Sequence, residues 1–319
     1  MSSAALGVIL SAGKGSRIDP LHARFPKSML PICNRPILEH QLDQMKSIGI
    51  REVIVVVGHL KEPIMRHLGD GSAFGVAVRY VEQQQTLGIA HAVMQLERHI
   101  DRPFLLYLGD ILYVPRDLGS MIRIAEREGA AVVLAAKREP QREAIFRNFL
   151  VDADERGRVS RVVEKPRHLV NDLKGCGIYY FLPDFFDAVR LTPRTALRDE
   201  YEITHAIQIA IDLGQKVFVA PVVEWDLNIT FPVDILEGNR YWRERLGQRN
   251  VVAPDVVLHP GARLEGAVLG AGVKVRHGIA LEDVVVFEGT DVTSREDLAG
   301  CLLFGEQIVR CRTQSAPGT

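Results

Sequence analysis

The chain has 319 residues and a mass of 35.5 kDa, about twice the length of a typical single domain. Its 47% hydrophobic and 25% charged residues are average for a globular protein, which excludes a fibre and a wholly disordered chain. Lys+Arg 39 and Asp+Glu 40 give a net charge of −1, which argues against extensive neutralisation of nucleic-acid phosphates. We therefore expect one large α/β domain or two domains, and no nucleic-acid partner.

Cysteine spacing and apolar run lengths predict the compartment. Cys33, Cys176, Cys301 and Cys311 are widely spaced and form no CxxC pair, so they are expected to be free thiols in a reducing compartment. The first apolar run ends at Ser11 and is far too short to span a bilayer, and no later run reaches that length. We expect a cytoplasmic protein that does not enter a membrane.

Short β-branched runs alternate with helical patterns in the first half of the chain. Strands are expected at 6–10, 53–57, 76–81 and 104–108, helices at 37–48, 62–68 and 89–98, and a further helix and strand end at Ala136. This alternation predicts βαβ crossovers in a Rossmann-like, mostly parallel sheet with helices on both faces. Ligands bind beyond the carboxyl ends of such strands, so the loops after Leu10 and Leu108 are candidate sites.

Beyond residue 250 the sequence becomes repetitive. Aliphatic residues recur six positions apart with a glycine halfway, at 258 and 264, 269 and 275, and 286 and 292, and the pair 303 and 309 repeats the spacing with its glycine displaced. This period suits a β-solenoid with room for roughly three coils of about 18 residues, whereas the alternative is a small antiparallel sheet. We therefore expect a main domain over residues 1–245 and a repeat tail over 246–319.

A glycine-rich loop, LSAGKGSR at residues 10–17, follows the first expected strand. Gly13 and Gly15 let the backbone turn tightly and present N–H groups to an anion, while Ser16 and Arg17 add a hydroxyl and a fixed positive fork. The loop matches neither the Walker loop nor the dinucleotide fingerprint GxGxxG. It is a candidate phosphate cradle, and the alternative is a plain structural turn.

Several segments, in this order, resemble the nucleotidylyltransferases that act on sugar 1-phosphates, in particular the glucose-1-phosphate thymidylyl- and uridylyltransferases. They are the LSAGKGSR loop, PKSMLPI at 26–32, LGDGS at 68–72, Gln83 five residues before Gly88, LGD at 108–110, VEKP at 163–166, GIY at 177–179 and EIT at 202–204. The likeness runs through nearly all of the first 240 residues. The tail looks like the short left-handed β-helix that many members carry.

The resemblance implies attack of a sugar phosphate oxygen on the α-phosphorus of a nucleoside triphosphate, which releases pyrophosphate and forms a nucleotide sugar. A phosphate nucleophile is already ionised near neutral pH, so positioning and charge neutralisation must supply the rate. Arg17 and Lys27 would hold the triphosphate, and Lys165 would grip the sugar phosphate. The implied nucleotide-binding residues are Leu10, Ala12, Gly13, Gly15, Ser16, Gln83 and Gly88.

The same resemblance implies a Mg²⁺ ion. Asp110, at the end of a strand, would bind it through oxygen. Relatives carry Trp-x-Asp-x-Gly-Thr or Asn-x-Asn-Thr-Pro-x-Asp at a second ligand position, where residues 225–234 here read WDLNITFPVD. Aligning the proline and final aspartate with the second form makes Asn228 the first choice, with Asp226 as the alternative on the same face of a strand.

The sequence says more about which base the nucleotide carries than about which sugar is bound. The Gln83 amide can donate and accept, which matches the edge of uracil or thymine, and Gly88 allows backbone approach to the ring, so UTP or dTTP is favoured. Glu164, Gly177 and Glu202 are the expected contacts to the sugar hydroxyls. The identity of the sugar is left open.

Three other functions compete with sugar-nucleotide formation. One is cytidylyl or other nucleotidylyl transfer to a non-sugar phosphate or phosphonate. Another is a catalytically silent regulatory protein that binds a nucleotide sugar, which the four retained charged residues argue against: Arg17, Lys27, Asp110 and Lys165. The third, an acyltransferase solenoid, is disfavoured by its few coils. Because an open solenoid end leaves unpaired strand edges, the tail is expected to pack against the main domain or against a second subunit, and a homo-oligomer is expected.

Overall fold

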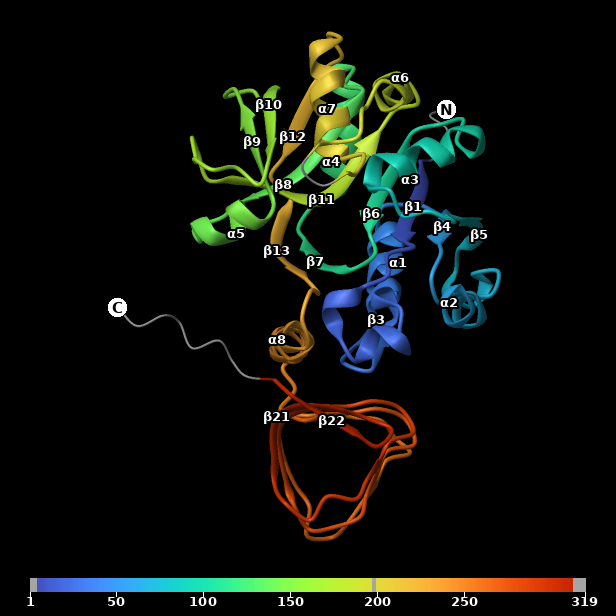
Figure 1. The fold of residues 1–319 in the computed structure, drawn as a ribbon, viewed down its shortest axis with the longest axis vertical. Coiled ribbons are helices and arrows are strands. Elements are labelled where there is room, and N and C mark those ends of the chain that lie inside the picture. Colours follow the sequence, from blue (N-terminus) through green and yellow to red (C-terminus); the bar gives the residue numbers. More distant parts are fainter. Residues whose placement is uncertain (1–4, 197–198, 312–319) are drawn as a thin grey trace. The chain divides into compact units, whose positions relative to one another are not determined.

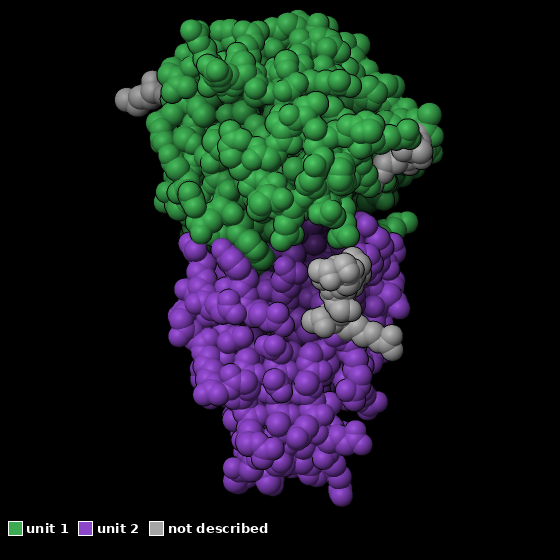
Figure 2. Space-filling view, turned by 90° about the vertical axis from the view of Figure 1, so that its left-hand side faces the viewer, with its two compact units in different colours: residues 1–14, 41–226 green, residues 15–40, 227–319 purple. Residues whose placement is uncertain are grey.

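The computed structural model describes residues 5–196 and 199–311, so residues 312–319 of the predicted tail lie outside it. The chain divides into two compact units, drawn in two colours in Figure 2. The first contains residues 1–14 and 41–226, and the second contains residues 15–40 and 227–319. Residues 15–40, which follow the first strand, thus belong to the same unit as the repeat tail. This division differs from the single boundary after residue 245 that the sequence predicts.

The first unit is built on a nine-stranded sheet (Figure 1). Its strands follow the order β10-β9-β11-β6-β1-β4-β5, and β8 pairs with both β11 and β12. The parallel part contains β1 (Leu6–Ser11), β4 (Glu52–Val57), β5 (Ala77–Glu82) and β6 (Phe104–Leu108). These are the strands that the sequence pattern predicts, within one or two residues.

The other side of the sheet is mixed. β8 (Val132–Arg138) and β12 (Val217–Ala220) are parallel to each other, but β11 (Leu173–Phe181) runs antiparallel to β6, β8 and β9. β9 (Phe149–Ala153) and β10 (Val159–Glu164) form an antiparallel hairpin. Short connections permit only antiparallel pairing, whereas a parallel pair needs a long crossover. Outside this sheet, β7 (Ile111–Pro115) pairs with β13 (Val223–Asn228).

Helices cover both faces of the sheet, as expected. The α-helices are α1 (Ile37–Ser47), α2 (Lys61–Leu68), α3 (Ile89–Leu96), α4 (Gly119–Glu128), α5 (Arg142–Arg147), α6 (Phe185–Arg190) and α7 (Ile203–Asp212), with 3-10 turns at Ser72–Phe74 and Glu97–His99. Leu6 and Val8 of β1 share a core with α3, α6 and α7. Gly7 faces the other way, since a Cβ there would lie 2.7 Å from Met45 Sδ of α1.

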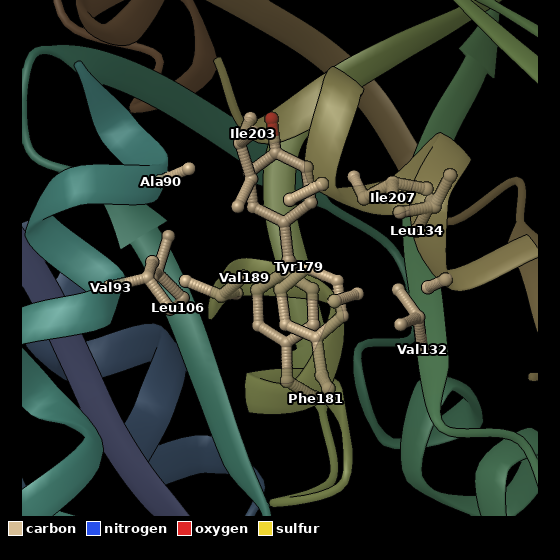
Figure 3. Packing of buried hydrophobic residues seen from close by; sticks show 14 of the residues in the cluster. Ala90, Val93, Leu106, Val132, Leu134, Tyr179, Phe181, Val189, Ile203 and Ile207 are labelled. Atoms are coloured by element: carbon tan, nitrogen blue, oxygen red, sulfur yellow. The ribbon is translucent and has the colours of Figure 1, made fainter. Parts of the chain in front are cut away.

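Aromatic residues of β11 form the centre of this core (Figure 3). The rings of Tyr179 and Phe181 lie 5.6 Å apart, and both residues are almost completely buried. Helix α3 contributes Val93 and α7 contributes Ile207 to the same cluster. Tyr179 is therefore a core residue, and the sheet that carries the candidate loops is held rigidly from one side.

Stacked parallel strands form most of the second unit. One side contains β14 (Val251–Val252), β17 (Val268–Leu269), β19 (Ala280–Val286) and β21 (Leu298–Phe304), and another contains β15 (Val257–Leu258), β18 (Lys274–Val275) and β20 (Asp291–Val292). A third side pairs β16 (Arg263–Glu265) with the start of β19. Figure 1 shows these strands as a triangular coil coloured orange to red.

The coil repeat is 17 residues, because Val251 pairs with Val268, Val268 with Val285, and Val285 with Leu302. The repeat prediction is confirmed in kind, and the antiparallel alternative is wrong. The fourth aliphatic pair of the repeat, at 303 and 309, does not start another coil. Instead β22 (Gln307–Arg310) folds back antiparallel on β21 through Gly305, whose φ is +57°. That hairpin covers the strand edge at one end of the coil.

The rest of the second unit is a compact segment and one long helix. The segment contains 3-10 turns at Ser16–Ile18, Leu21–Ala23 and Lys27–Met29, and a short hairpin of β2 (Pro31–Ile32) and β3 (Arg35–Pro36). Helix α8 spans Pro232–Arg245. Across both units, the part of the chain that the structure describes contains no helix with the length and apolar character needed to cross a membrane.

Candidate functional site

The ends of β1 and β6 lie side by side in the first unit. Leu10 is opposite Leu108 in the parallel register, and the Gly109 N–H donates to the Leu10 carbonyl over 2.9 Å. A Cβ at Gly109 would lie 2.6 Å from that carbonyl and from Ser11 Oγ, so only glycine fits. Asp110 follows directly. The prediction that the loops after Leu10 and Leu108 share one edge of the sheet is confirmed.

The start of the glycine-rich loop and the base-reading candidate Gln83 both lie against Gly58. Ala12 is buried, and a Cβ at Gly58 would lie 3.0 Å from both its Cβ and its carbonyl oxygen. The same position would be 3.1 Å from the carbonyl of Gln83, whose N–H bonds to Val57. Gly58 thus leaves room for both Ala12 and Gln83 beside it. The sequence reading missed this glycine, although it directly follows a predicted strand.

The Gln83 side chain is fixed by its neighbours. Gln83 is 5% exposed, and its Nε2 lies 3.2 Å from Nδ1 of His91 on α3. Burial lowers the pKa of His91, aided by Arg194 and opposed by a hydrogen bond with the Gln85 backbone. The imidazole is therefore neutral at pH 7, when one ring nitrogen remains an acceptor. The Gln83 amide is consequently held by a partner rather than free to turn.

At Gly88 the backbone lies too close to Tyr201 for any side chain to fit. Its φ is +107°, and a Cβ there would lie 2.5 Å from the carbonyl oxygen of Tyr201. The Leu87 carbonyl accepts from Tyr201 N–H, and the Ala90 N–H donates to the Tyr201 carbonyl. The loop at 87–90 is thereby fixed on Tyr201, which immediately precedes the candidate sugar contact Glu202. Sequence reasoning did not select Tyr201.

The candidate sugar-side residues come from β10 and α7. Thr204 Oγ1 lies 3.3 Å from Glu164 Oε2, which brings the end of β10 to the first turn of α7, where Glu202 is the N-cap residue. Lys165 is exposed and has a φ of +43°, a conformation that costs a non-glycine residue about 1–3 kcal/mol. Its N–H donates to the Asn148 carbonyl over 2.8 Å. The backbone thus holds Lys165 in an unfavourable conformation directly after Glu164.

Gly177 and both candidate carboxylates are grouped around one buried phenol. Tyr113 donates its hydroxyl to the Gly177 carbonyl over 2.9 Å, and Gly177 has a φ of +68°. Burial raises the pKa of Tyr113 well above its usual value, and the negative charges of Asp110 and Asp226 contribute to the shift. Asp110 and Asp226 thus both act on the same phenol, although they are 116 positions apart in the sequence.

Asp226 belongs to a buried group of four charged residues that the sequence reading missed. Lys174 Nζ lies 2.8 Å from each Asp226 carboxylate oxygen, and Lys137 Nζ lies 3.1 Å from Oδ1. Glu139 accepts from Lys137 over 2.8 Å. Lys174 stands in the otherwise apolar strand LKGCGIYYF, and that isolated charge was the available signal. Buried charges need such partners, because an unpaired one costs several kcal/mol.

The second unit contains the remaining residues of the glycine-rich loop. Gly15 has a φ of +64°, and a Cβ there would lie 3.1 Å from Cγ of Lys27, so glycine leaves room for the lysine stem. Ser16 and Arg17 form an exposed 3-10 turn. Asn228 is exposed in the same unit.

The proline–aspartate part of the predicted second metal motif has a local role in this unit. Asp234 Oδ2 accepts the N–H groups of Thr230 and Phe231, each over 2.6 Å, and so caps the start of α8. Phe231 is the N-cap residue, and Pro232 occupies the first helical position, where its missing N–H costs nothing. These residues shape the chain just after Asn228.

The chain belongs to the nucleotidyl transferase family, since residues 6–243 match that family. It is 35% identical over 259 residues to the low-salt glycan biosynthesis nucleotidyltransferase Agl11 of Haloferax volcanii, covering 79% of this chain and 70% of the relative. It is 34% identical over 241 residues to the UTP–glucose-1-phosphate uridylyltransferase AglF of the same organism, covering 76% and 98%. A glucose-1-phosphate thymidylyltransferase of Streptomyces antibioticus is 33% identical over 285 residues, covering 84% and 78%.

Solved structures show the same fold. A UDP-glucose pyrophosphorylase complexed with UDP-glucose superposes with a TM-score of 0.68 at 20% identity, covering 76% of this chain and 100% of that one. A protein described as a putative glucose-1-phosphate thymidylyltransferase, from Bacillus anthracis, gives 0.67 at 22% identity, covering 76% and 96%. The Rossmann-like nucleotidyltransferase fold implied by the motif order is confirmed.

Proposed function

We propose that this protein transfers a nucleotidyl group from UTP or dTTP to a sugar 1-phosphate, releasing pyrophosphate and forming a nucleotide sugar. The observation that carries the proposal is the close contact between Gly109 and the end of β1, since Asp110 directly follows Gly109 and the glycine-rich loop directly follows β1. The named activities of the uridylyl- and thymidylyltransferase relatives support it.

Charge placement supports a mechanism without a side-chain base. The attacking sugar phosphate is already ionised, so the protein has to align it with the α-phosphorus and neutralise charge that develops on the triphosphate. In this proposal Arg17 and Lys27 hold the triphosphate and Lys165 holds the sugar phosphate. Two backbone conformations support these roles. Gly15, with a positive φ, leaves room for the side chain of Lys27, and Lys165 itself has a positive φ.

The backbone and the buried polar residues select the substrates in this proposal. Leu10, Ala12, Gly13, Gly15 and Ser16 present the loop to the nucleotide, and Gln83 with Gly88 reads uracil or thymine. The contact between Gln83 and His91 supports this, since a fixed amide discriminates better than a rotating one. Glu164, Gly177 and Glu202 contact the sugar, and the Thr204–Glu164 contact that brings the two glutamates' elements together supports the pairing.

A Mg²⁺ ion fits the donor set of the first unit. Asp110 and Asp226 supply carboxylate oxygens, which that ion prefers, and they lie near the same phenol. Within the described residues no three His, Cys, Asp or Glu side chains form a ready metal cluster, so substrate phosphates would complete the coordination. When bound, the ion would neutralise phosphate charge. We propose Asp110 as the main ligand, with Asp226 and Asn228 as the candidates for the second ligand. Both candidates need testing, because the carboxylate of Asp226 is already paired with Lys174.

The tail and the assembly complete the proposal. We propose that residues 1–245 contain the reacting groups and that residues 246–319 form a left-handed β-helix, supported by the three-sided 17-residue repeat. Strands β14 and β15 each pair on one side only among the described residues, which supports a homo-oligomer. A cytoplasmic location also stays a proposal, in keeping with the free thiols that the structure shows.

Pyrophosphate release tests the proposed reaction. The purified full-length protein is assayed with Mg²⁺, five nucleoside triphosphates and the 1-phosphates of glucose, N-acetylglucosamine, galactose and mannose. We expect turnover with UTP or dTTP, and a loss of discrimination between bases in Gln83→Ala. Turnover with CTP, GTP or ATP alone would contradict the base assignment, and silence with every pair, in protein that still binds nucleotide, would contradict the reaction.

A further inference from the structure

The segment at 25–34, which includes Lys27, runs along one corner of the coil within the second unit. At equivalent corner positions of successive coils lie Gly270, just after β17, Phe287, just after β19, and Phe304, the last residue of β21, each 17 residues after the previous one. Phe25 meets two of these: its ring lies 5.1 Å from that of Phe287 and 5.7 Å from that of Phe304, both edge to face. Lys27 is two residues beyond Phe25.

The other end of the segment is fixed one coil earlier. Asn34 Nδ2 donates to the carbonyl of Leu269 over 2.7 Å, and Leu269 is next to Gly270 of the same corner. Residues 25–34 therefore span three consecutive coils, with an aromatic contact at one end and a hydrogen bond at the other. A β-solenoid with one coil fewer would lose either the aromatic contacts of Phe25 or the hydrogen bond of Asn34.

Helix α8 holds the same segment from a second direction. The buried side chain of Asn239 accepts from the Cys33 N–H over 2.7 Å and donates to the Pro31 carbonyl over 2.9 Å. The rings of Trp242 and His40 lie 4.6 Å apart. Edge-to-face aromatic contacts of this kind add to the stabilisation from area burial and so favour one conformation of the short segment.

We propose that the coil is a positioning element for catalysis: the corner formed by Phe287, Phe304 and the Leu269 carbonyl holds the segment that carries Lys27. This inference rests on the proposed function, since it assumes that Lys27 serves the nucleotidyl transfer. Phe25 and Asn34 are positioning residues, not catalytic ones. The need to span three coils accounts for a tail of this length.

The test compares Phe25→Ala and Asn34→Ala with the wild type, and uses Phe25→Leu as the conservative variant. Phe25 is only partly buried, so its removal leaves the coil core intact. Leu281→Ala is the matched control, because Leu281 lies in the coil core and belongs to the cluster that does not include the 25–34 segment. Two readouts are taken on each full-length variant: kcat and the KM for the triphosphate, and hydrogen exchange of residues 16–36 and of the coil.

We expect Phe25→Ala to raise exchange in residues 16–36 but not in the coil, and to lower kcat roughly 10- to 100-fold, since a misplacement of about 1 Å costs that much. Phe25→Leu should recover most of both effects, and Leu281→Ala should lower the coil's protection while leaving kcat within about threefold of the wild type. Faster exchange in 16–36 with unchanged kcat would overturn the proposal, as would an equal loss of kcat in Leu281→Ala. If the wild type has no transfer activity, the proposed function fails, and the exchange pattern alone then decides whether the coil orders the segment.

Discussion

Lys174 Nζ lies 2.8 Å from both carboxylate oxygens of Asp226, and both side chains are almost completely buried. The pair joins β11 to the end of the first unit's chain, one residue after Trp225. Because Asp226 is also a candidate metal ligand, a metal ion would compete for its carboxylate with the ammonium groups of Lys174 and Lys137. The Lys174–Asp226 pair is thus both a structural element and part of the candidate site.

Replacing Lys174 with Met should destabilise the protein by about 3 kcal/mol, because the buried carboxylates of Asp226 and Glu139 would then share only Lys137. Urea unfolding measures the change. Arg116→Ala is the control, since the Arg116–Glu224 pair is exposed and its loss should cost less than about 1 kcal/mol. Equal destabilisation by the two substitutions would show that the buried group contributes no special stability.

Acid should weaken the same group through Glu139. Burial raises the pKa of Glu139, but the Lys137 ammonium, the Gln141 N–H and the charge of Lys174 outweigh it, so the pKa lies below its ordinary value. A carboxyl with a lowered pKa stabilises the fold fully above that ordinary value and loses the contribution as pH falls through the lowered one. The free energy of unfolding should therefore drop as pH falls below the ordinary value of 4.5, and more shallowly in Glu139→Gln. Parallel pH profiles for the two proteins would contradict this.

Gly88→Ala should cost roughly 3 kcal/mol, because the added methyl group would overlap the Tyr201 carbonyl at a φ that only glycine adopts readily. Gly214→Ala separates the two causes. Gly214 has a φ of +81° but open space around its Cβ position, so that variant should lose only about 1 kcal/mol. Thermal unfolding of the two variants gives the comparison, and a similar loss in both would remove the argument that Tyr201 packs against the 87–90 loop.

Local patterns predicted much of the first unit. The β-branched runs identified β1, β4 and β6, the helical spacing over 37–48 identified α1, and the loop after Leu108 was placed at the correct edge of the sheet. These features depend on periodicity and turn chemistry, which neighbouring residues determine. The 17-residue coil could be read almost as well, since stacked coils repeat their own contacts.

Long-range pairings could not be read in the same way. The contact of Phe25 with Phe287 and Phe304 joins a loop residue without periodicity to two coil corners more than 260 positions away. No local pattern specifies such a partner, so the assignment of residues 15–40 to the second unit was not predicted. Lys174 and Lys137 were missed for the same reason, since their carboxylate partner Asp226 is distant in sequence.

The fate of the α-phosphorus tests the central claim most directly. UTP or dTTP labelled with ³²P at the α-position is incubated with Mg²⁺, a sugar 1-phosphate and the full-length protein, alongside its Asp110→Ala variant. The account predicts that the label enters a nucleotide sugar in equal amount to the pyrophosphate released, and that Asp110→Ala retains its fold but loses at least about 100-fold in rate. Label that stays in the triphosphate with every sugar 1-phosphate, or an Asp110→Ala variant as active as the wild type, would contradict it.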